Sequence, residues 1–457
     1  MAEIDHTNLH RTAKLFMDDG RAATHEEAME MLESFGLTIT VSADAANSRD
    51  GQIALLTLIN AARRTLLGGV AVTGGLDVPL IAPLADGPTL KDAVLQLGGH
   101  ADGSRPPTWP VAQIGDGEPP DGALGWRLCW QGWRGGVVPI DQSNPFNDNI
   151  GIAPAPAMAA AACAAEAFAF HACDHRMAAR RTAGISLWSP GADWLVANSA
   201  EPKLAFLPSR LWLIGLGNLG QAYAWLLACL PYDAPTKVDL MLQDYDRLAE
   251  SNDSTSLLSS LCLVGRMKSR WLAEWLERRG FTTFIEERRF GQWTKRQLDE
   301  PGVALCGVDN ALARAALEKA GFDLVIESGL GAGPQSFRSF AMHVFPGQRR
   351  ADQIWPRANN ESMPDALAQP AYSALKETLD SCGLAQLATR TVGVPFVGLL
   401  AAGLVISETL RRLHGGVALE VISGSALALE DLEVVTTISD VWSHGHLPTG
   451  TPIKTKV

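Results

Sequence analysis

Short hydrophobic runs alternate with helical patterns in the second half of the chain. Apolar runs of strand length predict strands, and apolar residues at helical spacing predict the helices between them. Strands are predicted over residues 210–214, 238–243, 302–306 and 324–326, and helices over 267–279, over 396–413 and from a glycine-rich turn to residue 230. Strands that alternate with helices are typical of a doubly wound α/β sheet.

The first half of the chain repeats this pattern less clearly. Two short amphipathic helices are predicted within residues 8–35, then a strand over 37–41, a helix over 53–65 and a strand over 68–72. This β-α-β unit has no glycines at its turn. Residues 101–122 are rich in Gly, Pro and Asp, which predicts a surface loop, and residues 152–180 predict an alanine-rich helix.

A weak internal repeat relates the two halves. A Pro-Phe pair at 145–146 precedes an apolar helix that contains Glu166, and a second pair at 395–396 precedes one that contains Glu408. Repeated signatures of this kind indicate duplicated units. The chain is therefore predicted to contain two related α/β halves, of which the first has lost its nucleotide turn.

Composition narrows the possible partners. The chain has 457 residues, 47% of them hydrophobic and 19% charged, which indicates a globular protein of two or three domains. Its formal net charge is −12, and it has no basic block, so nucleic acid is excluded as an expected partner. The two most apolar stretches, 153–170 and 391–407, contain Pro or Gly and run into an acidic residue, which argues against membrane spans. The first residues lack the pattern of a secretory signal, so a cytoplasmic location is expected.

The first motif with a predicted chemical role in the second half is rich in glycine. Gly215-Leu216-Gly217-Asn218-Leu219-Gly220 follows a predicted strand and begins a helix. Gly215 permits the tight turn, Gly217 lets a phosphate approach the backbone, and Gly220 lets the helix pack on the strand. Asp244, at the end of the next strand, is suited to bind a ribose. These residues predict a nucleotide site, without specifying the nucleotide.

Three further motifs follow in order. They are Asp244-Tyr245-Asp246 with Ser251-Asn252 a few residues later, Gly265-Arg266-Met267-Lys268, and Asp309-Asn310 with Arg314. Together with the glycine turn they resemble the ThiF-type adenylating family, which includes the ubiquitin-activating enzymes. The resemblance covers about residues 205–345 and implies two Rossmann-like (ThiF-type) halves packed as a pseudo-twofold pair, the C-terminal half carrying the nucleotide site. The compact activating enzymes of bacterial ubiquitin-like conjugation operons are similar in length and layout.

The resemblance also implies the domains and the substrates. The implied domains are an inactive adenylation-like domain (1–195), an active adenylation domain (196–355), an inserted loop (356–390), and a closing helix with C-terminal strands (391–457). The implied reaction uses ATP and Mg²⁺ to adenylate the C-terminal carboxylate of a ubiquitin-like protein. A conjugating enzyme is the implied second partner. A duplicated pair within one chain makes a homodimer possible but not required.

The family pattern assigns a role to each motif. The nucleotide would contact Gly215, Gly217, Asn218, Leu219, Gly220, Asp244, Asp246 and Asn252. Lys268 would neutralise charge that develops on the α-phosphate, and Asp309 would position Mg²⁺. A carboxylate that attacks a phosphate must be relieved of like-charge repulsion, so a cation and a metal are needed there. Thr255 stands where the family has an arginine, and either Arg266 or an arginine of the first half would have to replace it.

The seven cysteines supply candidates for a thioester. They are Cys129, Cys163, Cys173, Cys229, Cys262, Cys306 and Cys382. None forms a C-x-x-C pair, which argues against a disulfide framework and a zinc ribbon. Cys382 precedes the closing helix, where ubiquitin-activating enzymes carry a catalytic cysteine, and an accessible thiolate can attack an acyl adenylate. Cys262 is the second candidate, and a packing role for either one stays open.

Two other functions remain possible from the sequence. The glycine turn also serves NAD(P)-dependent oxidoreductases, although that function leaves the Lys268 and Asp309 motifs unexplained. Thr255 also allows a catalytically inactive ThiF-like scaffold. The motifs do not name the ubiquitin-like protein, the conjugating enzyme or the final target.

Overall fold

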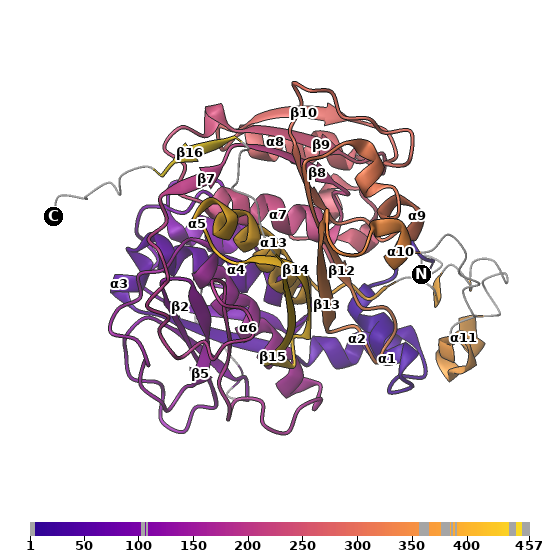
Figure 1. Cartoon of the computed structure of the whole chain (residues 1–457). Helices are drawn as coiled ribbons and strands as arrows, with labels where there is room; N and C mark the ends of the chain where they lie inside the picture. Colours follow the sequence, from indigo (N-terminus) through magenta and orange to yellow (C-terminus); the bar gives the residue numbers. More distant parts are fainter. Residues whose placement is uncertain are drawn as a thin grey trace.

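The protein is built on two mixed β-sheets, of six and eight strands, and a short two-stranded ribbon. The computed structural model describes residues 5–101, 106, 108–355, 365–375, 384, 387–388, 391–437 and 445–449. In Figure 1 the first sheet, which belongs to the N-terminal half of the chain, lies at the lower left. Strands β8, β9 and β10 of the second sheet lie at the top.

The first sheet has the strand order β2-β1-β3-β4-β5-β6. Its strands are β1 (Gly36–Val41), β2 (Gly69–Gly74), β3 (Val111–Ile114), β4 (Gly125–Gln131), β5 (Arg134–Pro139) and β6 (Ala183–Ser186). Strands β2, β1, β3 and β4 are parallel to one another. Strand β5 pairs antiparallel with β4, and β6 pairs antiparallel with β5.

The second sheet has the strand order β10-β9-β8-β11-β12-β13-β14-β15. Its strands are β8 (Arg210–Ile214), β9 (Asp239–Gln243), β10 (Thr282–Glu286), β11 (Val303–Cys306), β12 (Leu324–Leu330), β13 (Ser339–Phe345), β14 (Ala418–Ser425) and β15 (Ala428–Thr437). Pairing is parallel from β10 to β12 and antiparallel from β12 to β15. The ribbon pairs β7 (Phe206–Pro208) with β16 (His446–Pro448).

Helices connect and cover these sheets. The α-helices are α1 (Arg11–Asp18), α2 (His25–Glu33), α3 (Ala43–Ala46), α4 (Arg49–Ala62), α5 (Leu90–Gln96), α6 (Pro154–His171), α7 (Asn218–Cys229), α8 (Lys268–Glu277), α9 (Ala311–Arg314), α10 (Ala351–Ile354), α11 (Pro370–Leu375) and α13 (Pro395–Leu413). The 3₁₀ helices are η1 (Pro235–Lys237), η2 (Glu250–Asn252), η3 (Leu261–Leu263), η4 (Leu317–Ala320) and η5 (Asp365–Ala368).

The two sheets repeat one topology. The order β2-β1-β3-β4-β5-β6 corresponds to β9-β8-β11-β12-β13-β14, and the change from parallel to antiparallel pairing falls at the same place in each. Helix α4 connects β1 to β2 as α7 connects β8 to β9, and α6 precedes β6 as α13 precedes β14. The second sheet adds one further strand at each edge, β10 and β15.

Helices α6 and α13 pack against each other where the two halves meet, with α4 and α7 beside them (Figure 1). Gly403 of α13 lies so close to Met158 of α6 that a Cβ atom would come within 2.2 Å of the sulfur. The indole N–H of Trp225 in α7 donates to the Thr57 hydroxyl in α4, over 3.0 Å. Small residues let α6 fit between its own sheet and α13, which explains its alanine-rich composition.

Several predicted elements differ from the structure. The predicted loop 101–122 contains β3, a buried strand between β1 and β4, because a four-residue run is too short to give a clear alternation. The alanine-rich helix ends at His171 and not at residue 180. Phe146 lies outside α6 and packs on Trp194, so the residue that matches Pro395 at a helix start is Pro154. Strand β10 was not predicted.

The region expected as an inserted loop contains short helices in its described part, namely α11 and η5. The phenol O–H of Tyr372 in α11 donates to Asp18 in α1, and Asp18 also pairs with Lys14. A hydrogen bond to a buried carboxylate therefore anchors α11 to the first helix of the chain.

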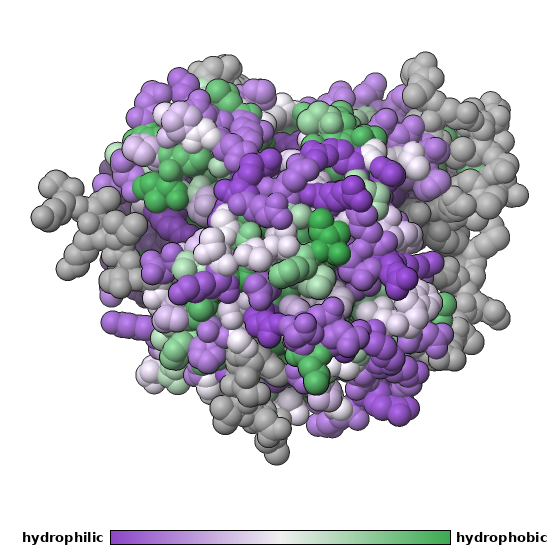
Figure 2. All heavy atoms as spheres, turned by 90° about the horizontal axis from the view of Figure 1, so that it is seen from above, coloured by the Kyte–Doolittle hydropathy of each residue, from purple (hydrophilic) through white to green (hydrophobic). Residues whose placement is uncertain are grey.

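Among the helices that the structure describes, none has the length and apolarity needed to cross a membrane. On the face shown in Figure 2, hydrophobic residues form small groups separated by hydrophilic ones.

Candidate functional site

A cavity of about 450 Å³ lies at the carboxyl ends of the parallel strands of the second sheet. The pairing places Ile214 of β8 opposite both Gln243 of β9 and Cys306 of β11, so the residues after these strands meet at one edge. Ligands of open α/β sheets bind at this edge. The predicted site residues that line the cavity are Gly215, Gly217, Asn218, Leu219, Asp244, Asp246, Asn252, Lys268 and Asp309.

The glycines of the turn have different surroundings. Gly215 has φ +80°, a conformation that favours glycine. A Cβ atom on Gly217 would meet nothing within 4 Å, so the turn is open there to the cavity. Gly220 does not line the cavity: a Cβ atom on it would lie 2.1 Å from the Gly215 carbonyl oxygen. Gly220 is therefore packed at the start of α7, and the prediction that it also contacts the nucleotide stays a prediction.

The start of α7 faces the cavity through this turn. Gly217 is the N-cap of α7, and no side chain caps the helix there. The first N–H groups of a helix and its dipole favour an anion. The turn can therefore accept a phosphate group.

Asp244 is fixed by the backbone on both sides. Its Oδ2 accepts the Leu216 N–H over 2.7 Å, and its Oδ1 accepts the Asp246 N–H over 2.8 Å. Burial raises the pKa of Asp244, while the Lys268 charge and these two N–H groups act in the opposite direction. The carboxylate thus ties the end of β9 to the glycine turn at a defined place in the cavity.

Lys268 is the first residue of α8, and its side chain contacts the segment that follows β9. Its Nζ lies 3.1 Å from Oδ2 of Asp246, and its backbone N–H donates to the Asp246 carbonyl over 3.0 Å. The Lys268 side chain is 11% exposed, whereas that of Asp246 is 48% exposed. An amine held in this way offers positive charge to a ligand in the cavity.

Asp309 follows β11 on a short, well-supported segment. The Asn310 side chain caps α9 by accepting the Ala313 N–H over 3.0 Å. Arg314 donates to the Val308 carbonyl over 2.8 Å and pairs with the buried Glu327 over 3.0 Å. Asp309 itself is exposed and lines the cavity. Its neighbours therefore fix the backbone at the place where Asp309 lines the cavity.

Two predicted asparagines also have structural partners. The Asn218 amide donates to the carbonyl of Gly393 and, over 3.4 Å, to that of Val394, just before α13. Asn252 accepts the Ala249 N–H over 2.9 Å. Asn218 therefore connects the glycine turn to the segment that leads into α13, and Gly393 from that segment also lines the cavity.

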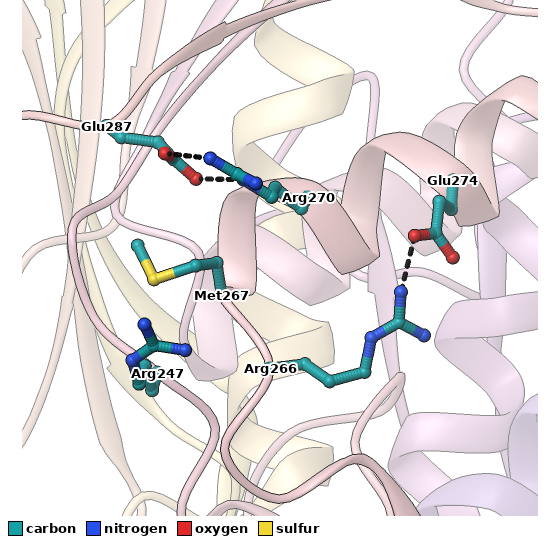
Figure 3. A pocket seen from close by; sticks show the side chains of 6 residues that line it. All are labelled: Arg247, Arg266, Met267, Arg270, Glu274 and Glu287. Atoms are coloured by element: carbon teal, nitrogen blue, oxygen red, sulfur yellow. Dashed lines mark hydrogen bonds and ion pairs between the residues drawn. The ribbon is translucent and has the colours of Figure 1, made fainter.

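Arg266, one candidate for the cation that the family has at Thr255, does not line the cavity that Thr255 lines. Arg266 lines a separate hollow of about 610 Å³ with Arg247, Met267, Arg270, Glu274 and Glu287 (Figure 3). There Arg266 pairs with Glu274, and Arg270 makes two hydrogen bonds of 2.8 Å to Glu287. Arg266 therefore has a carboxylate partner outside the cavity that Thr255 lines.

Arg11, from the first half of the chain, lines the same cavity as Thr255. It begins α1, and its backbone N–H donates to the Ser254 hydroxyl over 3.0 Å. The other arginines that line the cavity without having been singled out are Arg288 and Arg289. Arg289 stacks over Tyr245 with 5.6 Å between guanidinium carbon and ring centre. No local motif marks these residues, because the fold alone brings them to the site.

The lining of the cavity suits a polyanion. The residues that line it include five with cationic side chains and three with carboxylates, namely Arg11, Lys268, Arg288, Arg289 and Arg314, and Asp244, Asp246 and Asp309. Within the described part of the chain no group of three or more His, Cys, Asp or Glu could hold a metal. Mg²⁺ is commonly held by one or two carboxylates together with substrate phosphates, so Asp309 with a bound polyphosphate fits that ion.

The described cysteines are either buried or exposed to solvent. Cys382 lies outside the described residues. Burial raises the pKa of Cys129, Cys229 and Cys306 to about 12, and it also raises that of Cys163, so these four thiols are poor nucleophiles. Cys173 and Cys262 are exposed, and the Cys262 sulfur lies 3.1 Å from the Ser260 hydroxyl. Cys262 therefore retains the accessibility that a nucleophile needs.

Comparison with known proteins gives matches over most of the chain. Residues 36–187 match the BilD N-terminal domain, and residues 207–416 match the BilD C-terminal domain. The bacterial E1-like protein BilD of Collimonas sp. (strain OK412) is 56% identical over 456 residues, which cover 98% of each chain.

Crystal structures of Escherichia coli MccB are more distantly similar. The structure with MccA-N7isoASN has 11% identity and a TM-score of 0.35, over 50% of this chain and 64% of that chain. The structure with ATP has 10% identity and a TM-score of 0.32 over the same shares. The full-length relative and the two matching domains together show that this chain belongs to the BilD family of bacterial E1-like proteins.

Proposed function

We propose that this protein uses MgATP to adenylate the C-terminal carboxylate of a ubiquitin-like protein. The acyl group then passes to Cys382 as a thioester and from there to a conjugating enzyme. The observation that carries the proposal is the convergence of Gly217, Lys268 and Asp309 on one cavity. The family relationship to an E1-like protein supports the same class of substrate.

In the first step, a carboxylate oxygen of the bound protein forms a bond to the α-phosphorus of ATP. The bond from that phosphorus to the bridging oxygen breaks, and pyrophosphate leaves. Lys268 offsets negative charge that develops around the α-phosphate, and the open backbone at Gly217 lets the phosphates approach the start of α7. Asp309 would hold Mg²⁺, which supplies further positive charge to the phosphates.

Arg11 is our candidate for the function of the missing family arginine. It lines the same cavity as Thr255, whereas Arg266 does not. A guanidinium group presents several donors in a fixed geometry that suits phosphate oxygens. The first half of the chain would then supply a cation to the site of the second half.

In the second step, the Cys382 thiolate attacks the acyl adenylate, AMP leaves, and a thioester forms. The proposed division of the chain places this residue in an insert (356–390) between an active adenylation domain (196–355) and its closing part (391–457). The inactive domain (1–195) is proposed as the other member of a pseudo-twofold pair. The repeated strand order of the two sheets supports that pairing.

ATP–pyrophosphate exchange tests the proposed function. Purified protein is mixed with ATP, Mg²⁺ and labelled pyrophosphate, with and without each candidate ubiquitin-like protein. Exchange that requires one such protein with an intact C-terminal carboxylate is the expected result. NADH oxidation without exchange would identify an oxidoreductase, and neither activity with any candidate would indicate an inactive scaffold.

The glycine turn gives a matched pair of substitutions. Gly217→Ala is expected to leave the melting temperature nearly unchanged, because its Cβ atom enters open space, but to raise the KM for ATP about tenfold by obstructing the phosphates. Gly220→Ala should instead destabilise the fold by about 1–3 kcal/mol, because its Cβ atom collides with backbone. Thermal unfolding and exchange kinetics check both, and normal ATP kinetics in Gly217→Ala would contradict the assignment of the turn to phosphate binding.

A further inference from the structure

One wall of the nucleotide cavity is a segment with little regular structure. After η2, the chain continues through turns to Ser260, and we refer to residues 250–260 as the wall segment. Asn252 and Thr255 of this segment line the cavity. Its first residues form η2 and a few turn hydrogen bonds, and the backbone groups outside these bonds need partners elsewhere.

Arg64, from the first half of the chain, supplies several of these partners. It follows the end of α4, and only 2% of it is exposed. Its Nη2 donates to the carbonyl oxygens of Leu257 over 2.9 Å and Ser259 over 3.0 Å. Its Nη1 donates to the Asp253 carbonyl, and its Nε donates to the Asn60 carbonyl of α4 over 3.1 Å. One guanidinium group thus joins three backbone oxygens of the wall segment to the end of α4.

Neighbouring side chains complete the attachment. The Asn60 amide donates to the Leu257 carbonyl over 3.0 Å. From the second half, Gln221 of α7 accepts the Leu258 N–H over 2.8 Å and contacts the Ser259 hydroxyl. The wall segment is therefore held between α4 of the first half and α7 of the second.

Burial of the Arg64 guanidinium group costs free energy, so a contribution to stability alone does not explain it well. Burial lowers the pKa of Arg64 well below its ordinary value, although Asp253 acts in the opposite direction. The Asp253 carboxylate, 3.2 Å away, is partly exposed and also pairs with Arg63. Well-packed apolar side chains commonly stabilise an interior at least as well as a buried charge does. What the guanidinium group adds is a rigid set of donors that fixes several carbonyl groups at once.

We propose that Arg64 is a positioning residue for the nucleotide site, which holds Asn252 and Thr255 in place through its hydrogen bonds to the backbone of the wall segment. This inference rests on the proposed adenylation. It gives the first half of the chain, which lacks a glycine turn, a defined part in a reaction whose motifs lie in the second half.

Arg64→Lys tests the proposal, with Arg63→Lys as the matched control. Lysine keeps the charge but cannot reproduce the planar fork, so the wall segment should shift. We expect kcat/KM for ATP in the exchange reaction to fall about 10–100-fold per folded molecule, mainly through KM, because small displacements of positioning groups have large effects. The rise in melting temperature that MgATP causes should shrink as well. Arg63→Lys alters one partly exposed contact and should change kcat/KM by less than about twofold.

Asn60→Ser provides a milder variant should Arg64→Lys fail to fold. It removes the amide donor to Leu257 and the side-chain oxygen that accepts Arg64, and we expect KM for ATP to rise about 3–10-fold. A lower melting temperature with unchanged ATP constants and an unchanged MgATP-induced shift, in whichever variant folds, would overturn the proposal and leave a structural role.

Binding of MgATP alone separates this inference from the proposed function. If the wild-type protein binds MgATP in calorimetry but shows no exchange with any ubiquitin-like protein, the proposed function fails. The comparison of Arg64→Lys with Arg63→Lys still decides the inference, because weaker MgATP binding in the first variant alone supports positioning. Equal binding in both contradicts it.

Discussion

Asp309→Ala is expected to reduce ATP–pyrophosphate exchange by at least about 100-fold, the scale seen when a group that stabilises a transition-state charge is removed. Asp309 is exposed in the cavity, and its backbone is supported by the Asn310 cap and by Arg314. Removal of its carboxylate should therefore leave the fold intact while it removes the proposed Mg²⁺ ligand. Exchange rates measured over a range of Mg²⁺ concentrations check the result, and a higher Mg²⁺ requirement is expected.

Asp323→Ala is the matched control for this substitution. Asp323 stands just before β12, at the opposite end of the parallel strands, where it pairs with Arg296 over 3.1 Å. Loss of a partly exposed ion pair should change stability by at most about 1 kcal/mol and leave exchange unaffected. Asp309→Ala with near wild-type exchange at every Mg²⁺ concentration would contradict its role in holding the metal.

Cys382→Ala is expected to abolish the thioester between this protein and the ubiquitin-like protein, while exchange stays within about twofold of wild type because adenylation precedes nucleophilic transfer. The thioester is detected as a band of higher mass that disappears after treatment with a reducing agent. Loss of the band with exchange retained would separate the two chemical steps.

Cys262→Ala serves as the comparison, since Cys262 is an exposed cysteine of the second half. We expect this variant to form the thioester normally. A thioester that survives in Cys382→Ala and is lost in Cys262→Ala would assign the nucleophile to η3 instead. The buried cysteines are not expected to substitute for either one, because burial disfavours their thiolate forms.

The strands and helices around the glycine turn were predictable because their signals are local. Strand β8, the turn and α7 occupy about 20 consecutive residues in which hydrophobic pattern and glycine spacing agree. In contrast, β3 has four residues inside a stretch rich in Gly and Pro, and only its pairing with β1 and β4 makes it a strand. A short strand buried in a sheet depends on its neighbours more than on its own residues.

The candidate site also has residues that could be predicted from local sequence and residues that could not. Asp244 and Asp309 could be placed at the cavity from the amino-acid order, because residues that follow parallel strands meet at the carboxyl edge of a sheet. Lys268, at the start of α8, was placed there only by the family resemblance. The position of Arg11 at the cavity and the attachment of the wall segment to Arg64 could not be predicted, because both depend on contacts between the two halves across almost 200 residues or more. Such contacts leave no periodic signature. Only the folded chain decides which arginine lines the cavity, since Arg266 pairs with Glu274 in another hollow and the packing of α1 brings Arg11 to the cavity.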